Sequence, residues 1–305
     1  MINPIQSISK TPAEFDVLCV GHASYDLVFS VPYHPGQDEK MLADSLLGCG
    51  GGPAANAAVC AARLGFKAAF AGYFGRDAFG DSHYTELQTH AIDTRFILRG
   101  DSPTPLSTIL VKPDGQRALI NYKGNTQALA ADAIDFAGIS TKTVLFDGHE
   151  PHISLALLAQ LGAYTPTILD AGSLHLGTQL LMDKVDYLVC SEKFAKQYAG
   201  DVQTALIKLA ALSPNVVITL GEHGLIWQRG HESGQLPAPS VMAIDTTGAG
   251  DAFHGAFAAA IAANMDWHDV LRYASATGAL CCTKMGARPG LPYPQDLNAL
   301  LASWQ

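Results

Sequence analysis

The stretch AIDTTGAGDAFHGAFAAAIAAN, residues 243–264, places a glycine turn and a single aspartate directly before a helix of small residues. The first N–H groups of a helix lack hydrogen-bond partners and lie at its positive end, so glycine turns that open helices attract anions. Gly248, Ala249 and Gly250 therefore form a candidate anion site. A carboxylate would repel the anion, so Asp251 is either a helix cap or a group placed beside a bound phosphate for chemistry.

The turn TTGAGD does not end in the Lys-Ser/Thr pair with which a P-loop cradles phosphates, which excludes a Walker-type site at this place. Phosphoryl transfer can also run on positioning and an anion hole, with an acid that accepts the proton of the attacking hydroxyl. A helix cap would explain Asp251 but not the glycines before it. The residues therefore favour Asp251 as a general base beside an anion hole.

The size and composition of the chain fit one large α/β domain. Of its 305 residues 48% are hydrophobic, so it can bury a large core. A net charge of −9 argues against nucleic acid or an anionic membrane as the main partner. The six cysteines show no CxxC spacing, which argues against zinc and disulfide frameworks. No apolar run is long enough to span a bilayer and the N-terminus lacks a secretory signal, so we expect a cytoplasmic protein.

Short strand-like runs alternate with helical segments along most of the chain, as in a mostly parallel sheet with helices on both faces. Two turn-rich segments, at about residues 29–48 and 96–124, interrupt this rhythm, and the second contains a hairpin around KPDGQ. We expect a single domain, residues 1–305, in which these segments form either a small antiparallel flap, which would be a lid over the carboxyl ends of the strands, or a plain surface hairpin. The strand-like run at residues 16–26 should place Asp26 at that rim.

The other expected elements follow from apolar periodicity and from glycine and cap signals. Asp81 is the expected N-cap of the helix FGDSHYTELQTHA. Strands are expected at residues 67–75, 143–148, 166–172, 187–192 and 215–221, and helices at residues 53–65, 79–91, within 246–287 and at 293–304.

A second glycine-rich stretch, GCGGGPAANAAVCAARLG at residues 48–65, precedes another small-residue helix. Gly50, Gly52 and Ala55 satisfy the dinucleotide spacing GxGxxG/A, so an NAD-binding function has to be weighed. That fingerprint should follow the first strand directly, whereas this stretch comes after a polar, turn-rich segment. The alternatives are a turn that lets a ligand approach the backbone, with Asn56 as a hydrogen-bonding amide, and plain tight helix packing.

Several polar residues fall at the ends of the expected strands or on the lid. A polyol ligand needs neutral and acidic hydrogen-bond partners, and a phosphate or sulfonate tail needs a cation. The sequence GHEPH, residues 148–152, contains two histidines and a glutamate but has no metal-ligand spacing. ITLGEHGLIW, residues 218–227, fits either the floor of a nucleotide pocket or a plain hairpin. The candidate ligand-binding residues are Asp26, Lys40, Asn56, Asn121, His149 and Glu150.

Together these stretches resemble the ribokinase-like (PfkB-type) carbohydrate kinases along nearly the whole chain. GGGPAANAAVCAARLG is similar to the first signature of that family and DTTGAGDAFHGAF to the second, with GRDAFGD, VVITLGEHG and GARPGLP in the expected order. The resemblance implies a ribokinase-like three-layer fold with a central, mostly parallel sheet and a small β-sheet lid that forms a homodimer. It also implies transfer of the γ-phosphate of ATP to a sugar hydroxyl, with Mg2+ as cofactor.

By this resemblance Asp251 is the base that deprotonates the sugar hydroxyl, and the turn from Gly248 to Gly250 holds the γ-phosphate. Many members also bind a monovalent cation, usually K+. The positions carried over are Asp26, Gly52 and Asn56 for the sugar, Ser191, Thr219, Gly221 and Gly224 for ATP, and Asp245, Thr247 and Gly286 for the monovalent cation.

The chain departs from the family at the NxxE motif, which organises magnesium and its waters. The motif is SEKF here, with Ser191 in place of Asn and Phe194 in place of Glu, and Glu192 is the nearby carboxylate. Within the family, GGGPAA, INY and Lys40 resemble the sulfofructose kinase and ketohexokinase types. In the sulfofructose kinase type the loop of His149 carries an arginine that grips a sulfonate. Histidine is a poorer partner for three oxygens, which favours an uncharged ketose, a ribose-like sugar or a nucleoside.

Three functions therefore compete with a sugar kinase. A nucleoside kinase would share the fold and the base. A sensor that kept the fold but lost the chemistry would explain SEKF, although it has no need for the intact GAGD. A dehydrogenase rests only on the weak dinucleotide spacing.

Overall fold

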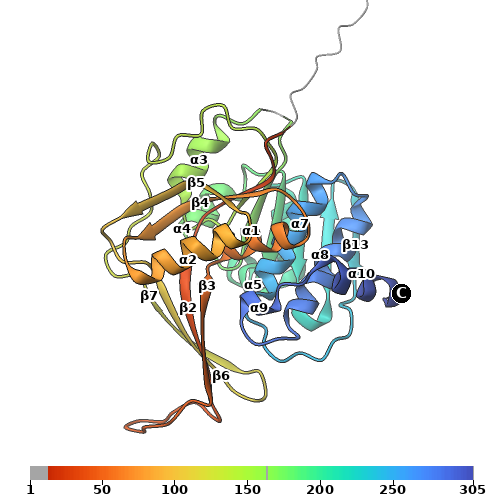
Figure 1. Ribbon diagram of the computed structural model, residues 1–305. Helices are drawn as coiled ribbons and strands as arrows, with labels where there is room; N and C mark the ends of the chain where they lie inside the picture. The colour runs from red at the N-terminus through yellow and green to blue at the C-terminus, as the bar shows by residue number, and fades with distance from the viewer. Residues whose placement is uncertain (1–12, 163, 305) are drawn as a thin grey trace, which may run out of the picture.

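Two β-sheets of unequal size organise the chain in the computed structural model (Figure 1). The structure describes residues 13–162 and 164–304, so residues 1–12, most of the stretch in which we expect no secretory signal, lie outside it. Within the described residues, no helix is both long enough and apolar enough to cross a membrane.

The large sheet confirms the predicted, mostly parallel arrangement. Seven adjacent strands, from β5 to β11 in space, run parallel, and β12 and β13 add an antiparallel hairpin at one edge. In spatial order, the strands in the described part of the chain are β13 (Glu232–Leu236), β12 (Leu225–Arg229), β11 (Asn215–Thr219), β10 (Tyr187–Ser191), β9 (Thr167–Ala171), β8 (Thr141–Phe146), β1 (Phe15–Val20), β4 (Ala68–Gly75) and β5 (Asp93–Gly100).

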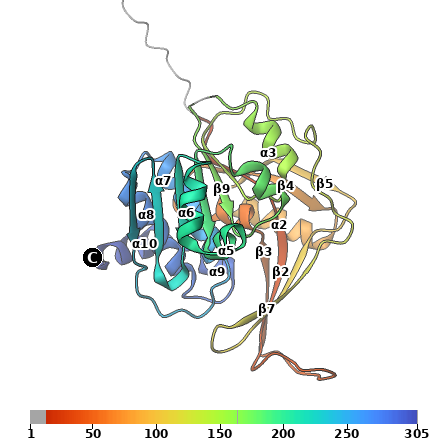
Figure 2. The same ribbon diagram turned by 180° about the vertical axis from the view of Figure 1, so that it is seen from behind.

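Helices cover both faces of the large sheet, as Figures 1 and 2 show from opposite sides. Successive side chains of a strand point to opposite faces, so Val17 and Cys19 join the core on one face while Leu18 and Val20 join the core on the other. The first layer contains α1 (Pro53–Arg63), α2 (Ala78–Thr89), α7 (Ala249–Ala262), α8 (Trp267–Cys281) and α10 (Pro294–Ser303), and the second contains α3 (Pro151–Leu158), α4 (Leu176–Leu181), α5 (Glu192–Ala199) and α6 (Val202–Ala210).

The small sheet forms a lid that projects from the body of the molecule in both views (Figures 1 and 2). The expected antiparallel pairing is found in its outer pairs, including the predicted hairpin around KPDGQ, but is wrong for the central pair, because β2 and β6 are parallel. In spatial order its strands are β3 (Ser45–Gly51), β2 (Ser24–Ser30), β6 (Leu106–Val111) and β7 (Arg117–Tyr122).

The strands of the lid coincide only in part with the two predicted segments: β6 and β7 lie within residues 96–124, whereas β2 and β3 extend beyond residues 29–48. The run at residues 16–26 is interrupted after β1, and Asp26 lies inside β2 of the lid rather than at the end of a strand of the large sheet. The end of the β5 segment, from residue 96, belongs to the large sheet, where it pairs with β4. Local sequence marks an extended segment but does not say which sheet it joins, because both sheets use the same strand conformation.

The N-cap of α2 is Asp77, so the prediction of Asp81 was wrong. The Asp77 carboxylate accepts a hydrogen bond from the Gly80 N–H at 2.8 Å and others from the backbone and hydroxyl of Thr104. Asp81 instead forms an ion pair with Arg99 at 2.6 Å. Both aspartates could cap a helix locally, and the contact with Thr104 favours the earlier one.

Helices α1 and α7 pack with their backbones close together because both carry small side chains at the contact. A Cβ atom at Gly255 would lie 2.5 Å from the carbonyl oxygen of Ala57 and 2.9 Å from its Cα. The Cys60 thiol donates to the carbonyl oxygen of Ala252 at 3.4 Å across the same contact. The close approach places Asn56, in the first turns of α1, opposite Asp251 in the first turn of α7.

We therefore expect Gly255→Ala to destabilise the protein by about 1–3 kcal/mol, because the added methyl group has to push α1 and α7 apart. Urea unfolding measures the free energy of unfolding directly. The control is Gly36→Ala in the exposed connection after β2, where an added Cβ would lie 3.5 Å from the flexible end of Glu39, an ordinary van der Waals distance. Equal stability of the two variants would contradict the tight contact.

Candidate active site

The N-terminus of α7 has the form of an anion site. Gly248, its N-cap, has φ 77°, in the left-handed region that favours glycine, and a Cβ there would collide with Ala287. A Cβ at Gly250 would meet no atom within 4 Å, so the space in front of it is open. Among the described residues, no acceptor pairs with the N–H groups of Gly250 and Asp251. The helix thus offers free donors at its positive end, as predicted from the glycine turn.

Asp251 carries one well-defined hydrogen bond, from the side-chain amide of Asn56. Asn56 Nδ2 donates to Asp251 Oδ2 at 2.6 Å. Burial raises the pKa of Asp251, and the Asn56 hydrogen bond opposes that rise because it favours the ionised carboxylate. A buried carboxylate with a raised pKa beside an anion site has the properties of a general base.

Arg288, which no predicted role covers, fixes the orientation of the Asn56 amide. This arginine is 2% exposed, and its Nε donates to Asn56 Oδ1 at 2.8 Å, so that the amide NH2 group turns toward the base. Its terminal nitrogens approach His83 Nε2 at 2.8 Å and Glu86 Oε1 at 3.4 Å. Glu86 Oε2 accepts from the Gly50 N–H at 2.6 Å. A chain of hydrogen bonds therefore connects lid strand β3 with Asp251.

A cavity of about 260 Å³ lies in front of Asp251, between the lid and the carboxyl ends of the large sheet. Lys40 is not part of its wall, because it lies on the exposed connection between β2 and β3. Of the residues expected to bind a sugar, the cavity brings together Asp26, Gly52, Asn56, Asn121 and His149.

Asp26 faces the cavity from lid strand β2 and is 5% exposed. Burial raises its pKa, although hydrogen bonds to Ser24 and Ser107 lower it in part. The Ser24 hydroxyl donates to Asp26 Oδ1 at 2.9 Å. Two carboxyl groups, of Asp26 and Asp251, thus line the same cavity, and such groups accept hydrogen bonds from the hydroxyls of a polyol.

Asp147, at the end of β8, was not among the predicted residues, yet it ties three segments together. Its Oδ2 accepts from the N–H of His22 at 2.7 Å and of Ala54 at 3.2 Å, and its Oδ1 accepts from the N–H of His149 at 2.9 Å. These groups belong to the connection from β1 to the lid, the start of α1 and the loop after β8. The signal was present as a buried acid at the end of a predicted strand.

The residues expected to bind ATP lie at the ends of neighbouring strands. Ser191 and Thr219 are register partners at the ends of β10 and β11, and Gly221 and Gly224 shape the short helix η1 (Gly221–His223) that follows. The Ser191 hydroxyl caps α5 by accepting from the backbone of Phe194 at 3.0 Å. These positions form the edge of the sheet beside the anion site.

The residues expected to bind a monovalent cation also meet. Asp245 accepts hydrogen bonds from the backbone and hydroxyl of Thr247 at 2.9 and 2.6 Å, and from the Gly286 N–H at 2.7 Å. An arginine from lid strand β7 joins them, since Arg117 Nη1 donates to the Thr247 hydroxyl at 2.8 Å. The lid therefore brings a positive charge to the residue directly before the anion site.

A buried pair, Asp170 and His254, lies behind the anion site. His254 Nδ1 is 2.7 Å from the carbonyl oxygen of Gly250 and 3.2 Å from Asp170 Oδ2, and its Nε2 is 3.2 Å from the carbonyl oxygen of Val189. Burial raises the pKa of Asp170 to about 7. The ring of His254 therefore joins the first turn of α7 to the ends of β9 and β10.

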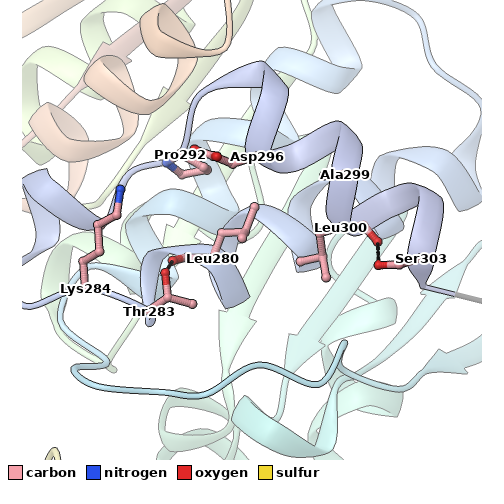
Figure 3. A pocket seen from close by; sticks show the side chains of 9 residues that line it. Leu280, Thr283, Lys284, Pro292, Asp296, Ala299, Leu300 and Ser303 are labelled. Carbon is pink, nitrogen blue, oxygen red and sulfur yellow. Dashed lines mark hydrogen bonds between the residues drawn. The ribbon is translucent and has the colours of Figure 1, made fainter.

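A further cavity, of about 420 Å³, lies between the end of α8 and α10 and is separate from this site (Figure 3). Its wall contains Lys284 and Asp296 among apolar and hydroxyl side chains. None of the predicted site residues lines it, so size alone does not locate the chemistry.

The sequence matches a known family over most of its length. Residues 14–294 match the family model described as pfkB family carbohydrate kinase. A ribokinase from Lactococcus lactis is 28% identical, over 93% of this chain and 96% of its own length. The crystal structure of ribokinase from Thermotoga maritima superposes with a TM-score of 0.82 at 26% identity, covering 94% of this chain and 99% of that one. Arabidopsis thaliana ribokinase, solved with ribose and ATP, shares the fold with a TM-score of 0.79 at 24% identity, covering 94% and 98%.

The Arg288 network predicts a large loss of stability on substitution. Arg288→Met leaves Glu86 and Asn56 Oδ1 without their buried donor, so the free energy of unfolding should fall by about 3–5 kcal/mol. Urea unfolding of the full chain tests this. Arg76→Met is the matched control, because Arg76 is exposed and pairs only with exposed Asp101, so its loss should cost less than about 1 kcal/mol. Similar small losses in both variants would show that Arg288 does not hold the network.

Proposed function

The chain belongs to the pfkB family of carbohydrate kinases, and from this membership we propose that it transfers the γ-phosphate of ATP to a hydroxyl group of a sugar. The observation that carries the proposal is the buried Asp251 beside a helix N-terminus with free N–H donors, at a cavity that the lid lines on one side. Asp251 is the proposed general base, and Gly248, Ala249 and Gly250 form the proposed anion hole.

In the proposed reaction, a sugar lies in the cavity with hydroxyls hydrogen bonded to Asp26 and Asn56. Asp251 accepts the proton of the attacking hydroxyl while that oxygen forms a bond with the γ-phosphorus. The bond between the γ-phosphorus and the oxygen that bridges to the β-phosphate breaks, and ADP leaves. The free N–H groups at the start of α7 stabilise the charge on the transferred phosphoryl group.

Two side chains, those of Arg117 and His254, are placed to support the anion hole. Arg117 is held on Thr247, directly before Gly248, and its charge lowers the pKa of Asp251. The contact of His254 with the Gly250 carbonyl orients the first turn of α7. Because Arg117 comes from the lid, closing the lid over a sugar would also complete the charge around the phosphate.

Magnesium enters this proposal with ATP, whose phosphate charge it neutralises during transfer. The chain does not offer it the ligands of the NxxE motif, because the Ser191 hydroxyl caps α5 and Glu192 pairs with Lys196 on the surface. In the part of the chain that the structure describes, no three His, Cys, Asp or Glu residues come together as a metal site. Mg2+ is often held mainly by substrate phosphates, and we propose the same here.

We also propose that a K+ ion binds beside the anion site. Asp245, Thr247 and Gly286 lie together, but both Asp245 oxygens already accept hydrogen bonds within the two loops. A cation bound there would have to share these oxygens. A homodimer through the lid is supported by apolar side chains exposed on its strands, at Leu46, Leu119, Ile120 and Tyr122.

A sensor without catalysis is less well supported, although SEKF favours it. A sensor does not need a carboxylate beside free helix donors, and here both are retained. A nucleoside kinase would use the same base and anion hole, so substrate tests have to include nucleosides. The dinucleotide spacing of Gly50, Gly52 and Ala55 lies between lid strand β3 and α1, not after the first strand of the large sheet.

Replacement of Asp251 tests its proposed role as the general base. Asp251→Asn should keep ATP binding but lower turnover by about two to four orders of magnitude, because the attacking hydroxyl loses its proton acceptor. ADP release is measured over hexoses, pentoses, ketoses, sugar acids, sugar phosphates and nucleosides. Asp269→Asn, an exposed aspartate in the first turn of α8, is the matched control and should retain turnover. Wild-type turnover in Asp251→Asn would remove Asp251 as the base.

The pH dependence of kcat/KM tests the same assignment. The base works only when ionised, so activity should rise with pH through its raised pKa. Asn56→Leu removes the hydrogen bond that lowers this pKa, so the acid limb of the kcat/KM profile should move to higher pH. Asn298→Leu, on the exposed side of α10, should leave the limb in place. A shift to lower pH, or none, would mean that the titrating group is not Asp251.

A further inference from the structure

The rings of three histidines lie close together at one end of the proposed sugar cavity. The ring centroids of His22 and His149 are 5.2 Å apart, and those of His149 and His175 are 4.8 Å apart with nearly parallel planes. The three follow β1, β8 and β9, which are neighbours in the large sheet, so their carboxyl ends bring the rings together. Local sequence gives no hint of this cluster, because its members are far apart in the chain.

The cavity continues beyond this cluster into a small recess of about 40 Å³. His22, Lys123 and His149 line both the main cavity and the recess, whereas Asp251 and Asn56 line only the main cavity. The recess therefore lies at the end away from the base. A water molecule needs about 10–15 Å³ measured in this way, so the recess has room for a small group with several oxygens.

In the described part of the chain, the ring nitrogens of His22 and His149 and the ammonium of Lys123 have no hydrogen-bond partner among the side chains and carbonyl groups of the residues that line the recess. No hydrogen bond joins a ring nitrogen of His22 or His149 to another described residue, and the Lys123 ammonium forms no ion pair with one. The lysine comes directly after lid strand β7, so its position depends on the lid. Three nitrogen groups that can donate hydrogen bonds thus converge on one space.

Two acidic side chains, Asp147 and Glu150, lie near these nitrogen groups, and both already accept backbone hydrogen bonds. Both oxygens of Asp147 already accept backbone hydrogen bonds. Glu150 accepts from the Leu129 N–H, and burial raises its pKa to about 7, so much of it is uncharged near neutrality. Burial, reinforced by the electrostatic effect of the neighbours His149 and Lys123, lowers the pKa of His22 and of His175. Both acidic side chains are thus already engaged by backbone donors, while the side-chain nitrogens of His22, Lys123 and His149 face the cavity.

We propose that the substrate carries a negatively charged oxyanion group, at the end away from the hydroxyl that is phosphorylated, and that His22, Lys123 and His149 bind this group. The proposal rests on the proposed kinase function and names its substrate class, a carboxylated, sulfonated or phosphorylated sugar. It differs from the expectation drawn from His149 alone, because the structure adds a lysine and a second histidine to the same wall. His175 stacks behind His149 and supports its ring.

Calorimetry on the full chain tests the proposal by binding, without turnover. Fructose is compared with its 6-carboxylate, 6-sulfonate and 6-phosphate counterparts, and ribose with ribose 5-phosphate. At least one charged sugar should bind about ten- to a hundredfold more tightly than its neutral counterpart, as charge-assisted hydrogen bonds do. The preferred member of the series identifies the oxyanion.

Binding of the charged sugar should also take up protons. The titratable side chains that line the recess are His22, Tyr73, Lys123, His149 and Glu150, with Asp147 and His175 beside them, and a bound anion favours the protonated form of each that titrates. Titrations in two buffers of different ionisation enthalpy should show this uptake for the charged sugar and not for its neutral counterpart. Affinity for the charged sugar should accordingly fall as pH rises above 7.

Two lid variants test whether Lys123 causes the preference for a charged sugar. Lys123→Met should lower the ratio of charged to neutral sugar affinity by about tenfold or more, whereas Lys112→Met, a lid lysine already paired with Asp114, should leave the ratio unchanged. The proposal is overturned if no charged sugar binds more tightly than its neutral counterpart, or if both variants change the ratio equally. Efficient phosphorylation of a neutral sugar without this preference would overturn the oxyanion site and leave the kinase standing. Absence of turnover on every sugar would count against the kinase itself.

Discussion

The hydrogen bond from Asn56 Nδ2 to Asp251 Oδ2 is the interaction on which the site depends. It joins residues 195 positions apart, and it forms because α1 and α7 approach until the backbone of one meets Gly255 of the other. Such an approach requires small side chains along both helices, which is why both are rich in alanine and glycine. The packing of two helices thus decides where a carboxylate stands relative to the anion site and the cavity.

A buried arginine also fixes the orientation of this hydrogen bond. Arg288 turns the Asn56 amide, and through Glu86 the same arginine reaches the Gly50 N–H at the base of the lid. On the other side of the anion site, Arg117 reaches from the lid hairpin to Thr247. The lid is therefore connected to the base and to the anion site by two separate arginines. Movement of the lid would change the surroundings of both, which links closure over a sugar to the charge around the phosphate.

Contiguous motifs were enough to single out the glycine turn, Asp251 and Asn56, because each lies in or beside the first turns of one helix. The alternation of strands and helices likewise revealed the large sheet. Arg288 and Asp147 were missed, since their partners Asn56 and Ala54 lie 232 and 93 positions away. The position of Asp26 in the lid was missed for a related reason: a strand-like pattern does not specify its sheet. Local rules therefore find the parts of a site, whereas long-range contacts decide how the parts face one another.

The cavity also has an electrical polarity, because its two ends are lined by different kinds of side chain, and no single sequence motif predicts this difference. Two buried carboxyl groups, Asp26 and Asp251, lie toward one end, and His22, His149 and Lys123 lie toward the other. A neutral polyol could satisfy the acidic end in several orientations, because its hydroxyls are chemically alike. A substrate with one charged end could enter in a single sense only, since reversing it would set its charge against two carboxyl groups. Such a polarity would select which hydroxyl meets Asp251, so the groups far from the reacting atoms would contribute to the regiochemistry of the transfer.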